Sequence, residues 1–321
     1  MVEMELVTVK HLVKQFKTVR AVDRVSFGVR EGEIFALLGP NGAGKTTVVR
    51  IILNIIRADD GLVSYNRAGD GQTALSPRAM GYLPEDRGLY PQVGVLKTLV
   101  YMGMLRSMTK ADARQAAEKW LSNIGLQDRG NENLGSLSKG NQQLIQLAAA
   151  LIHRPRLALL DEPFAGLDPV NQQRVIDLIE HLRKSGMTVI LNSHQMELVE
   201  RIADRVLLMS EGREVLSGTV DEVRQRGGGE RCVSLSLECP PDSKALERLA
   251  SVATVDNNTN ELVQLTVSDK AALSEVLSIA GDCLKIQDVS TRPLSLYDVY
   301  IRALNRARPT DPINAAEINS P

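Results

Sequence analysis

The feature that most constrains the fold is a short apolar run that opens directly into a glycine-rich loop. The run is Ile34–Leu38, and the loop reads Gly39-Pro40-Asn41-Gly42-Ala43-Gly44-Lys45-Thr46-Thr47 before a helical pattern begins. A strand, then G-x-x-x-x-G-K-[ST], then a helix is the arrangement of a phosphate-binding loop. Its glycines let backbone N–H groups approach a phosphate, and the helix N-terminus adds positive potential. We expect Lys45 to reach the β- and γ-phosphates and the Thr46 hydroxyl to bind Mg²⁺.

A second apolar run, at 157–160, ends in two adjacent acidic residues. Asp161 and Glu162 follow it directly, and Pro163 comes next. Two acids at a strand end can simply be a solvated turn. Beside a phosphate-binding loop we interpret Asp161 as a Mg²⁺ ligand, directly or through water, and Glu162 as the group that polarises the attacking water. These motifs indicate nucleotide hydrolysis but do not define its class.

The chain alternates short apolar runs with helical stretches from residue 5 to about 217. This pattern predicts an α/β fold with a largely parallel sheet covered by helices. Strands are expected at 34–38, 157–160 and 188–191, and a hairpin over 205–217 that turns at Glu211-Gly212. Strand signals vanish between about 86 and 135, where apolar residues at helical spacing predict a helical insertion. Trp120 lies on that apolar stripe, so a core position is expected for it.

A second, smaller domain is expected after a glycine-containing linker at 224–231. We place the first domain at 5–222 and the second at 232–306. The runs 233–238 and 262–267 alternate like half-buried strands, and helical patterns cover 243–252, 270–279 and 293–303. This order predicts a small α+β domain, for which the split βαβ type is a candidate. The remaining segment, 307–321, is expected to be a loose tail.

Charge and composition exclude several classes. The chain has 38 Lys plus Arg against 39 Asp plus Glu and only 3% aromatic residues. The near-zero net charge argues against a protein that holds nucleic acid by its overall field. The low aromatic content argues against a platform on which the bases of a single strand would stack. The longest apolar run, 147–152, is far below the roughly 18 residues of a membrane span. The N-terminus has no secretory signal, and three cysteines without metal-ligand spacing predict reduced thiols in the cytosol.

The class is suggested by Leu137-Ser138-Lys139-Gly140-Asn141-Gln142, which resembles the LSGGQ signature of the ABC ATPases apart from Lys139 and Asn141. A helical stretch follows it and leads into the strand that ends at Asp161. In that family the signature serine and second glycine bind the γ-phosphate of the ATP held by the partner subunit. The resemblance therefore implies that role for Ser138 and Gly140. Read alone, the segment would be an ordinary helix cap.

Other matches follow in the family's order. Ala165-Gly166-Leu167-Asp168 resembles the D-loop, and His194 resembles the switch histidine that contacts the γ-phosphate. Phe16 matches the aromatic residue that stacks on adenine. It could instead be a core residue, since Phe27 is also available nearby in the sequence. Gly81-Tyr82-Leu83-Pro84-Glu85 resembles the Q-loop, where most relatives have Gln. The resemblance thus implies that Glu85 contacts Mg²⁺ and the attacking water.

The resemblance implies a P-loop ABC ATPase core with a helical subdomain. The region containing Leu294-Ser295-Leu296-Tyr297-Asp298-Val299-Tyr300 resembles, more weakly, the accessory domain of the sodium-, drug- and lipid-export branch. The expected protein is an ATP-hydrolysing subunit on the cytoplasmic face of the cell membrane, powering an exporter through separate integral-membrane permease subunits. Two copies, or this chain and a homologue, would sandwich two ATP molecules, with Glu162, His194 and Glu85 as catalytic groups.

Two alternatives belong to other classes. The first is a soluble ABC ATPase in DNA repair or translation, which usually carries a long coiled-coil insertion or two cassettes in one chain. The second is a P-loop kinase or GTPase, which leaves the signature segment and His194 unexplained. For the loop after Glu85, the resemblance places Leu89 and Tyr90 against the membrane subunit, whereas both could instead pack on the helical insertion.

Overall fold

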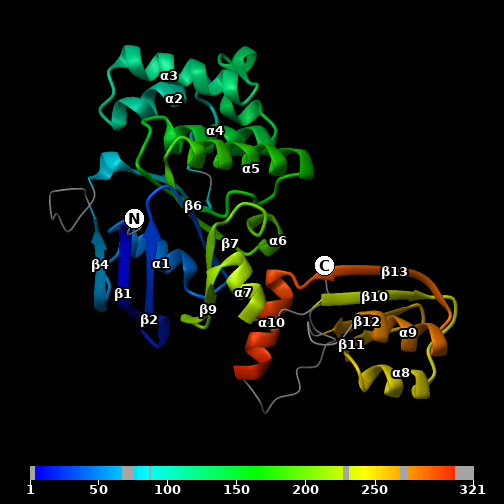
Figure 1. Ribbon diagram of the computed structural model, residues 1–321. Helices are drawn as coiled ribbons and strands as arrows, with labels where there is room; N and C mark the ends of the chain where they lie inside the picture. Colours follow the sequence, from blue (N-terminus) through cyan, green and yellow to red (C-terminus); the bar gives the residue numbers. More distant parts are fainter. Residues whose placement is uncertain (1–3, 67–75, 87, 227–230, 268–272, 308–321) are drawn as a thin grey trace. The chain divides into compact units, whose positions relative to one another are not determined.

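The computed structural model describes residues 4–66, 76–86, 88–226, 231–267 and 273–307 (Figure 1). The chain divides into two compact units, Met1–Ser217 and Gly218–Pro321, which we describe separately. Within the described residues, no helix is both long and apolar enough to cross a membrane.

The first unit is built on a six-stranded sheet in the order β5-β6-β7-β3-β8-β9. Its strands are β3 (Ile34–Leu38), β5 (Met80–Leu83), β6 (Leu157–Asp161), β7 (Thr188–Ser193), β8 (Arg205–Ser210) and β9 (Arg213–Thr219). Strands β5, β6, β7, β3 and β8 pair in parallel. β3, β6 and β7 are buried at every position. The predicted α/β fold is therefore confirmed, and the β8–β9 hairpin turns at Glu211-Gly212.

A three-stranded antiparallel sheet, which the sequence analysis did not anticipate, lies in the same unit. Its order is β2-β1-β4, with β1 at Glu5–Phe16, β2 at Val19–Arg30 and β4 at Asp60–Tyr65. It shares a core with α1 (Lys45–Ile52), and Phe27 stacks on Phe35 with ring centroids 5.0 Å apart. Phe16, by contrast, is 46% exposed at the end of β1. Phe27 is therefore the core residue, and the alternative that Phe16 is core is wrong.

Helices occupy the chain between β5 and β6, and no strand lies there among the described residues. They are α2 (Val95–Leu105), α3 (Lys110–Asn123) and α4 (Lys139–Leu151), with 3-10 turns at Gln127–Arg129 and Leu134–Ser136. Thr109 caps α3 by accepting a hydrogen bond from the Asp112 N–H group. α2 and α3 lie side by side, and α4 leads back to β6 (Figure 1). α5 (Pro169–Lys184) and the short α6 (Met196–Val199) complete the unit, with a 3-10 turn at Pro77–Ala79 before β5.

The second unit is an α+β arrangement around the antiparallel sheet β11-β12-β10-β13. Its elements are α7 (Val220–Arg226), β10 (Arg231–Leu237), α8 (Ser243–Ala250), β11 (Thr254–Asn258), β12 (Leu262–Val267), α9 (Leu273–Cys283), β13 (Ile286–Pro293) and α10 (Leu296–Ala307). α8 and α9 contribute Leu249 and Val276 to a core with Val233 and Leu235 of β10.

Several boundaries in the second unit differ from expectation. β11 and β13 were not anticipated, and α10 begins at Leu296 because Pro293 ends β13. The expected linker overlaps the last turn of α7 and the start of β10, and its residues 227–230 lie outside the described residues. Residues 270–272 of the helix expected at 270–279 also lie outside them. Of the expected tail, 308–321 also lies outside them.

Candidate functional site

The glycine-rich loop lies between β3 and α1, where two of its glycines touch other backbone segments. A Cβ atom at Gly44, whose φ is +97°, would lie 2.1 Å from the Ala21 carbonyl oxygen of β2. At Gly39 a Cβ atom would lie 2.2 Å from the Met209 carbonyl oxygen of β8. Any side chain at these positions would push the loop away from the sheets. The loop can therefore keep this conformation only with glycine there.

Lys45 begins α1 and folds back over this loop. Its side chain is buried, and its Nζ atom donates hydrogen bonds to the carbonyl oxygens of Gly39 (2.8 Å) and Pro40 (3.0 Å). Burial lowers the pKa of Lys45, and the carboxylates of Glu162, Asp161 and Glu85 oppose that shift. A cation is thus held within a loop of the kind that binds phosphates.

Three side chains from separate elements meet at the carboxyl end of β6. Asp161 of β6 lies opposite Asn192 of β7 in the sheet register, and Thr46 projects from α1. The Asn192 amide donates a hydrogen bond to Asp161 Oδ1 and another to Thr46 Oγ1 (3.2 Å), while Thr46 Oγ1 lies 3.4 Å from Asp161 Oδ1. Burial raises the pKa of Asp161 to about 6, against the opposing Asn192 hydrogen bond.

This cluster has the donor chemistry of a Mg²⁺ site. Asp161 Oδ2 is buried and has no hydrogen-bond partner among the described residues. An unpaired buried carboxylate oxygen is costly unless a cation or a donor reaches it. The Thr46 hydroxyl and the Asp161 carboxylate are hard oxygen ligands of the kind that Mg²⁺ prefers. The residues present therefore fit the metal that the sequence analysis expected.

Glu162 is held in a fixed orientation directly after β6. Its side chain is only 6% exposed, Ser193 Oγ donates to its Oε2 (3.2 Å), and His194 Nδ1 lies 2.8 Å from its Oε1. Its backbone has a φ of +47°, in the left-handed region that non-glycine residues rarely adopt, and its N–H group donates to the Asn192 carbonyl oxygen (2.8 Å). A carboxylate fixed in this way can accept a proton from a water molecule.

The signature segment is attached to a different part of the unit. Ser138 is the N-cap of α4, where its Oγ accepts a hydrogen bond from the Asn141 N–H group (3.3 Å). A Cβ atom at Gly140 would lie 2.4 Å from Asn171 Nδ2, which itself donates to Asp168 Oδ2 (2.6 Å). Asn171 thus joins the signature segment to the D-loop segment. Among the described residues, no hydrogen bond links Ser138 to the glycine-rich loop.

Glu85 and Phe16 lie at the margin of the site. Glu85 is exposed two residues after β5 and makes no hydrogen bond within the described residues. Its charge nevertheless opposes the lowering of the Lys45 pKa by burial, and it adds to the raising of the Asp161 pKa by burial. It is therefore within electrostatic reach of both. The Phe16 ring carries Lys14 Nζ 5.4 Å from its centroid. Phe16 pairs with Val19, two residues before the Ala21 carbonyl that meets Gly44.

The site also contains three residues that were not predicted from the sequence, Asn192, Ser193 and Asn171. Asn192 contacts both Asp161 and Thr46, and Ser193 contacts Glu162. A usable signal was present, because Asn192 and Ser193 follow the apolar run of β7 directly. Side chains at the carboxyl ends of neighbouring parallel strands gather at one edge of the sheet. No comparable signal points to Asn171, whose partner Gly140 is distant in sequence.

The fold and the site together define a P-loop nucleotide-binding protein. Comparison with known proteins makes this more specific, since residues 22–165 match the ABC transporter family and residues 218–304 match the C-terminal domain of the DrrA1-3-like ATP-binding proteins. The uncharacterized ABC transporter ATP-binding protein YhaQ of Bacillus subtilis (strain 168) is 32% identical over 296 residues, 92% of this chain and 97% of YhaQ. The chain belongs to the ATP-binding proteins of ABC transporters, whose ATP-binding domains are ATPases.

Two further comparisons agree with this assignment. The linearmycin resistance ATP-binding protein LnrL of the same Bacillus strain is 31% identical, with 83% of this chain and 86% of LnrL aligned. A solved structure described as the ATP binding subunit of an ABC transporter superposes with a TM-score of 0.61 at 28% identity, covering 70% of this chain and 93% of that one.

Proposed function

We propose that this chain is the ATP-hydrolysing subunit of an exporter, and that it closes with a second such subunit over two ATP molecules. The observation that carries the hydrolytic part is the buried carboxylate of Glu162, which Ser193 and His194 hold in place. The proposed location is the cytoplasmic face of the cell membrane, against separate integral-membrane permease subunits.

In the proposed reaction, water attacks the γ-phosphorus atom and the bond to the ADP oxygen breaks. Glu162 accepts the proton that the water loses, while Lys45 and the N–H groups of the glycine-rich loop bind the phosphate oxygens. Thr46 and Asp161 would hold Mg²⁺, which neutralises phosphate charge when bound. His194, which lies beside Glu162, would contact the γ-phosphate. The partner subunit's Ser138 and Gly140 would complete each site.

Export is supported by the second unit and by the relatives. Residues 218–304 match a domain named after the DrrA1-3-like proteins, and one relative with 30% identity is the daunorubicin resistance protein DrrA3 of Streptomyces coeruleorubidus. The soluble alternative in DNA repair or translation has less support, because the longest helix among the described residues, α5, has only 16 residues. That length is too short for the coiled coil such proteins usually carry.

The proposed permease contact lies beside α2. A hollow of about 360 Å³ there is lined in part by Leu89, Leu105 and Gln146, and the Oε1 atom of Gln146 is buried without a hydrogen-bond partner among the described residues. Tyr90 is 65% exposed and Tyr101 is 53% exposed. Tyr90 therefore does not pack in the helical segment, which supports its use as an anchor for an apolar helix of the permease.

Replacing Leu89 and Tyr90 by Ser is expected to release the chain from the membrane without changing its basal ATPase rate. The change removes apolar contact area from the proposed anchor but touches no residue of the nucleotide site. The measurement is the fraction of chain that co-purifies with detergent-solubilised membranes, together with the ATPase rate of the isolated chain. Tyr297→Ser, at an exposed tyrosine of α10, is the matched control. Unchanged membrane retention, or a lowered melting temperature, would refute the anchor.

Replacing Glu85 by Gln is expected to weaken Mg²⁺ binding, so that the free Mg²⁺ concentration needed for half-maximal ATPase activity rises about threefold. An effect of only this size is expected because Glu85 is exposed and screened. A carboxylate binds Mg²⁺ more strongly than an amide does, and without metal it repels the phosphate charge. The measurement is an ATPase titration against free Mg²⁺. Asp86→Asn, which removes the neighbouring exposed charge, is the control, and superimposable curves for parent and Glu85→Gln would mean that Glu85 is only a loop charge.

A further inference from the structure

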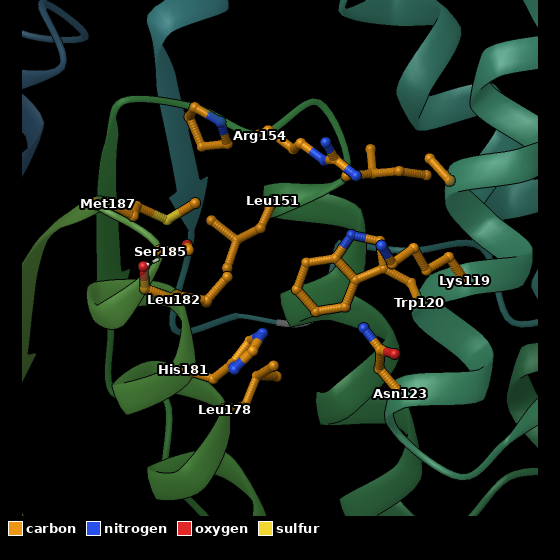
Figure 2. A pocket seen from close by; sticks show the side chains of 14 residues that line it. Lys119, Trp120, Asn123, Leu151, Arg154, Leu178, His181, Leu182, Ser185 and Met187 are labelled. Carbon is orange, nitrogen blue, oxygen red and sulfur yellow. Dashed lines mark hydrogen bonds between the residues drawn. The ribbon is translucent and has the colours of Figure 1, made fainter.

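A hollow of about 390 Å³ opens between α3, the end of α5 and the turn that joins α4 to β6 (Figure 2). Leu151, Leu182 and Met187 form an apolar floor. Trp120 is only half-buried, so the core position expected for it is wrong. Its indole extends from α3 toward this opening, and the His181 ring enters the hollow from α5 (Figure 2). The volume is within the range of small-molecule sites, which combine apolar walls with a few polar groups.

The charged side chains that line this hollow all have one sign. Lys119 and Arg154 line it beside His181, and none of its 14 lining residues is acidic. Within the described part of the chain, neither the Lys119 nor the Arg154 side chain has an ion pair or a hydrogen bond. The adjoining hollow, which shares His181 with this one, contains both Asp177 and Arg174. An anion would therefore find favourable charge in the first hollow without breaking an existing ion pair.

Arg154 has an unusual backbone conformation for an arginine. Its φ is +52°, in the left-handed region, just after α4 ends and before β6 begins. Glycine or asparagine is the usual choice where a helix ends in this conformation, because a Cβ atom is unfavourable there. The strain is not needed for the turn itself, since glycine would make the same turn more easily.

The hollow is separate from the nucleotide site. Arg154 lies in the turn before β6, which begins at Leu157, and Met187 lies directly before β7, which begins at Thr188. Asp161 and Asn192 lie at the opposite, carboxyl ends of the same two strands. A ligand in the hollow would therefore not compete with ATP for its loop.

We propose that this hollow binds a small organic anion with a flat aromatic body. The aromatic body would stack on the Trp120 indole above the apolar floor, and the anionic group would lie among Lys119, Arg154 and His181. Such a ligand would contact α3 on one wall and α5 on the other.

The chain contains a single tryptophan, so Trp120 fluorescence reports on this hollow directly. The probe is 8-anilinonaphthalene-1-sulfonate, added to the full chain with ADP at saturation to block the nucleotide site. We expect saturable quenching of Trp120. The neutral analogue N-phenyl-1-naphthylamine should bind at least about tenfold more weakly, because it lacks the charge-assisted contacts. Inorganic phosphate alone should not displace the probe, since it has no ring to stack.

Two variants test the basic side chains. Arg154→Gly and Lys119→Gln should each raise the probe's dissociation constant severalfold, and together by at least about tenfold. Arg154→Gly should not lower the melting temperature, because glycine adopts the left-handed backbone conformation without strain. If Arg154→Gly does lower it, Lys119→Gln by itself tests the proposal. Lys110→Gln, an exposed lysine on the same helix outside the hollow, should leave binding unchanged. Equal binding by all variants, equal weakening by Lys110→Gln, or a signal found only without ADP would overturn the proposal.

Discussion

Replacing Glu162 by Gln is expected to lower ATP turnover by roughly 10²- to 10⁴-fold while leaving ATP binding intact. The amide has nearly the same size and can still contact Ser193 and His194, which lie 3.2 and 2.8 Å from the carboxylate oxygens. It cannot accept the proton of the attacking water. The measurement is steady-state ATPase activity beside equilibrium binding of ATP to the purified chain.

The same variant also tests dimer closure. If ATP closes two subunits and hydrolysis opens them, Glu162→Gln with Mg²⁺ and ATP should elute from a sizing column at twice the monomer mass. Glu180→Gln, at a side chain of α5 that is 40% exposed, makes the same chemical change away from the site and should behave as the parent. A parental ATPase rate would show that Glu162 is not the base. If turnover is lost but no dimer forms, Glu162 remains the proposed base and the ATP-driven closure of two subunits is rejected.

Replacing Lys45 by Ala is expected to weaken ATP binding itself by about ten- to a hundredfold, because a charge-assisted hydrogen bond to phosphate is lost. The effect should be large because Lys45 is buried and tethered to the Gly39 and Pro40 carbonyl oxygens. Its ammonium is therefore already confined to the loop and loses little freedom on contacting phosphate. Equilibrium binding of a fluorescent ATP analogue gives the dissociation constant.

A packing effect is separated from a charge effect by Lys45→Met. Methionine keeps an unbranched stem in the buried space but removes the charge and the hydrogen-bond donors. Both variants should lose affinity to a similar extent. Parental affinity in Lys45→Met would mean that the stem alone matters and that the ammonium does not bind phosphate.

Much of the nucleotide site could be read from local sequence, because each part is a contiguous run with a strong physical requirement. The loop at 39–47 needs glycines in order, and the acid pair stands directly after a buried strand. Lys45, Thr46, Asp161 and Glu162 were named in this way, and His194 was named through its resemblance to the switch histidine. The structure brings these residues together. The proposed roles of Glu162 and Lys45 are tested by Glu162→Gln and Lys45→Ala.

Other parts of the site could not be read locally. The contact between Gly140 and Asn171 joins α4 to the start of α5, and the Asn192 amide reaches Asp161 from the neighbouring strand. Both depend on which strands and helices are neighbours. β1 was missed for a related reason, since register shifts interrupt its pairing and break the simple alternation that marks a strand.

The sequence by itself determined the α/β class, the phosphate-binding loop and the family, because these depend on short motifs and on the order of apolar runs. Only the tertiary structure decided that Phe27 is core while Phe16 is exposed, that Asn192 and Ser193 belong to the site, and that Lys119, Arg154 and His181 surround one hollow. The physical reason is that periodicity describes one element at a time. Burial and the convergence of charges arise only when elements distant in sequence pack against each other.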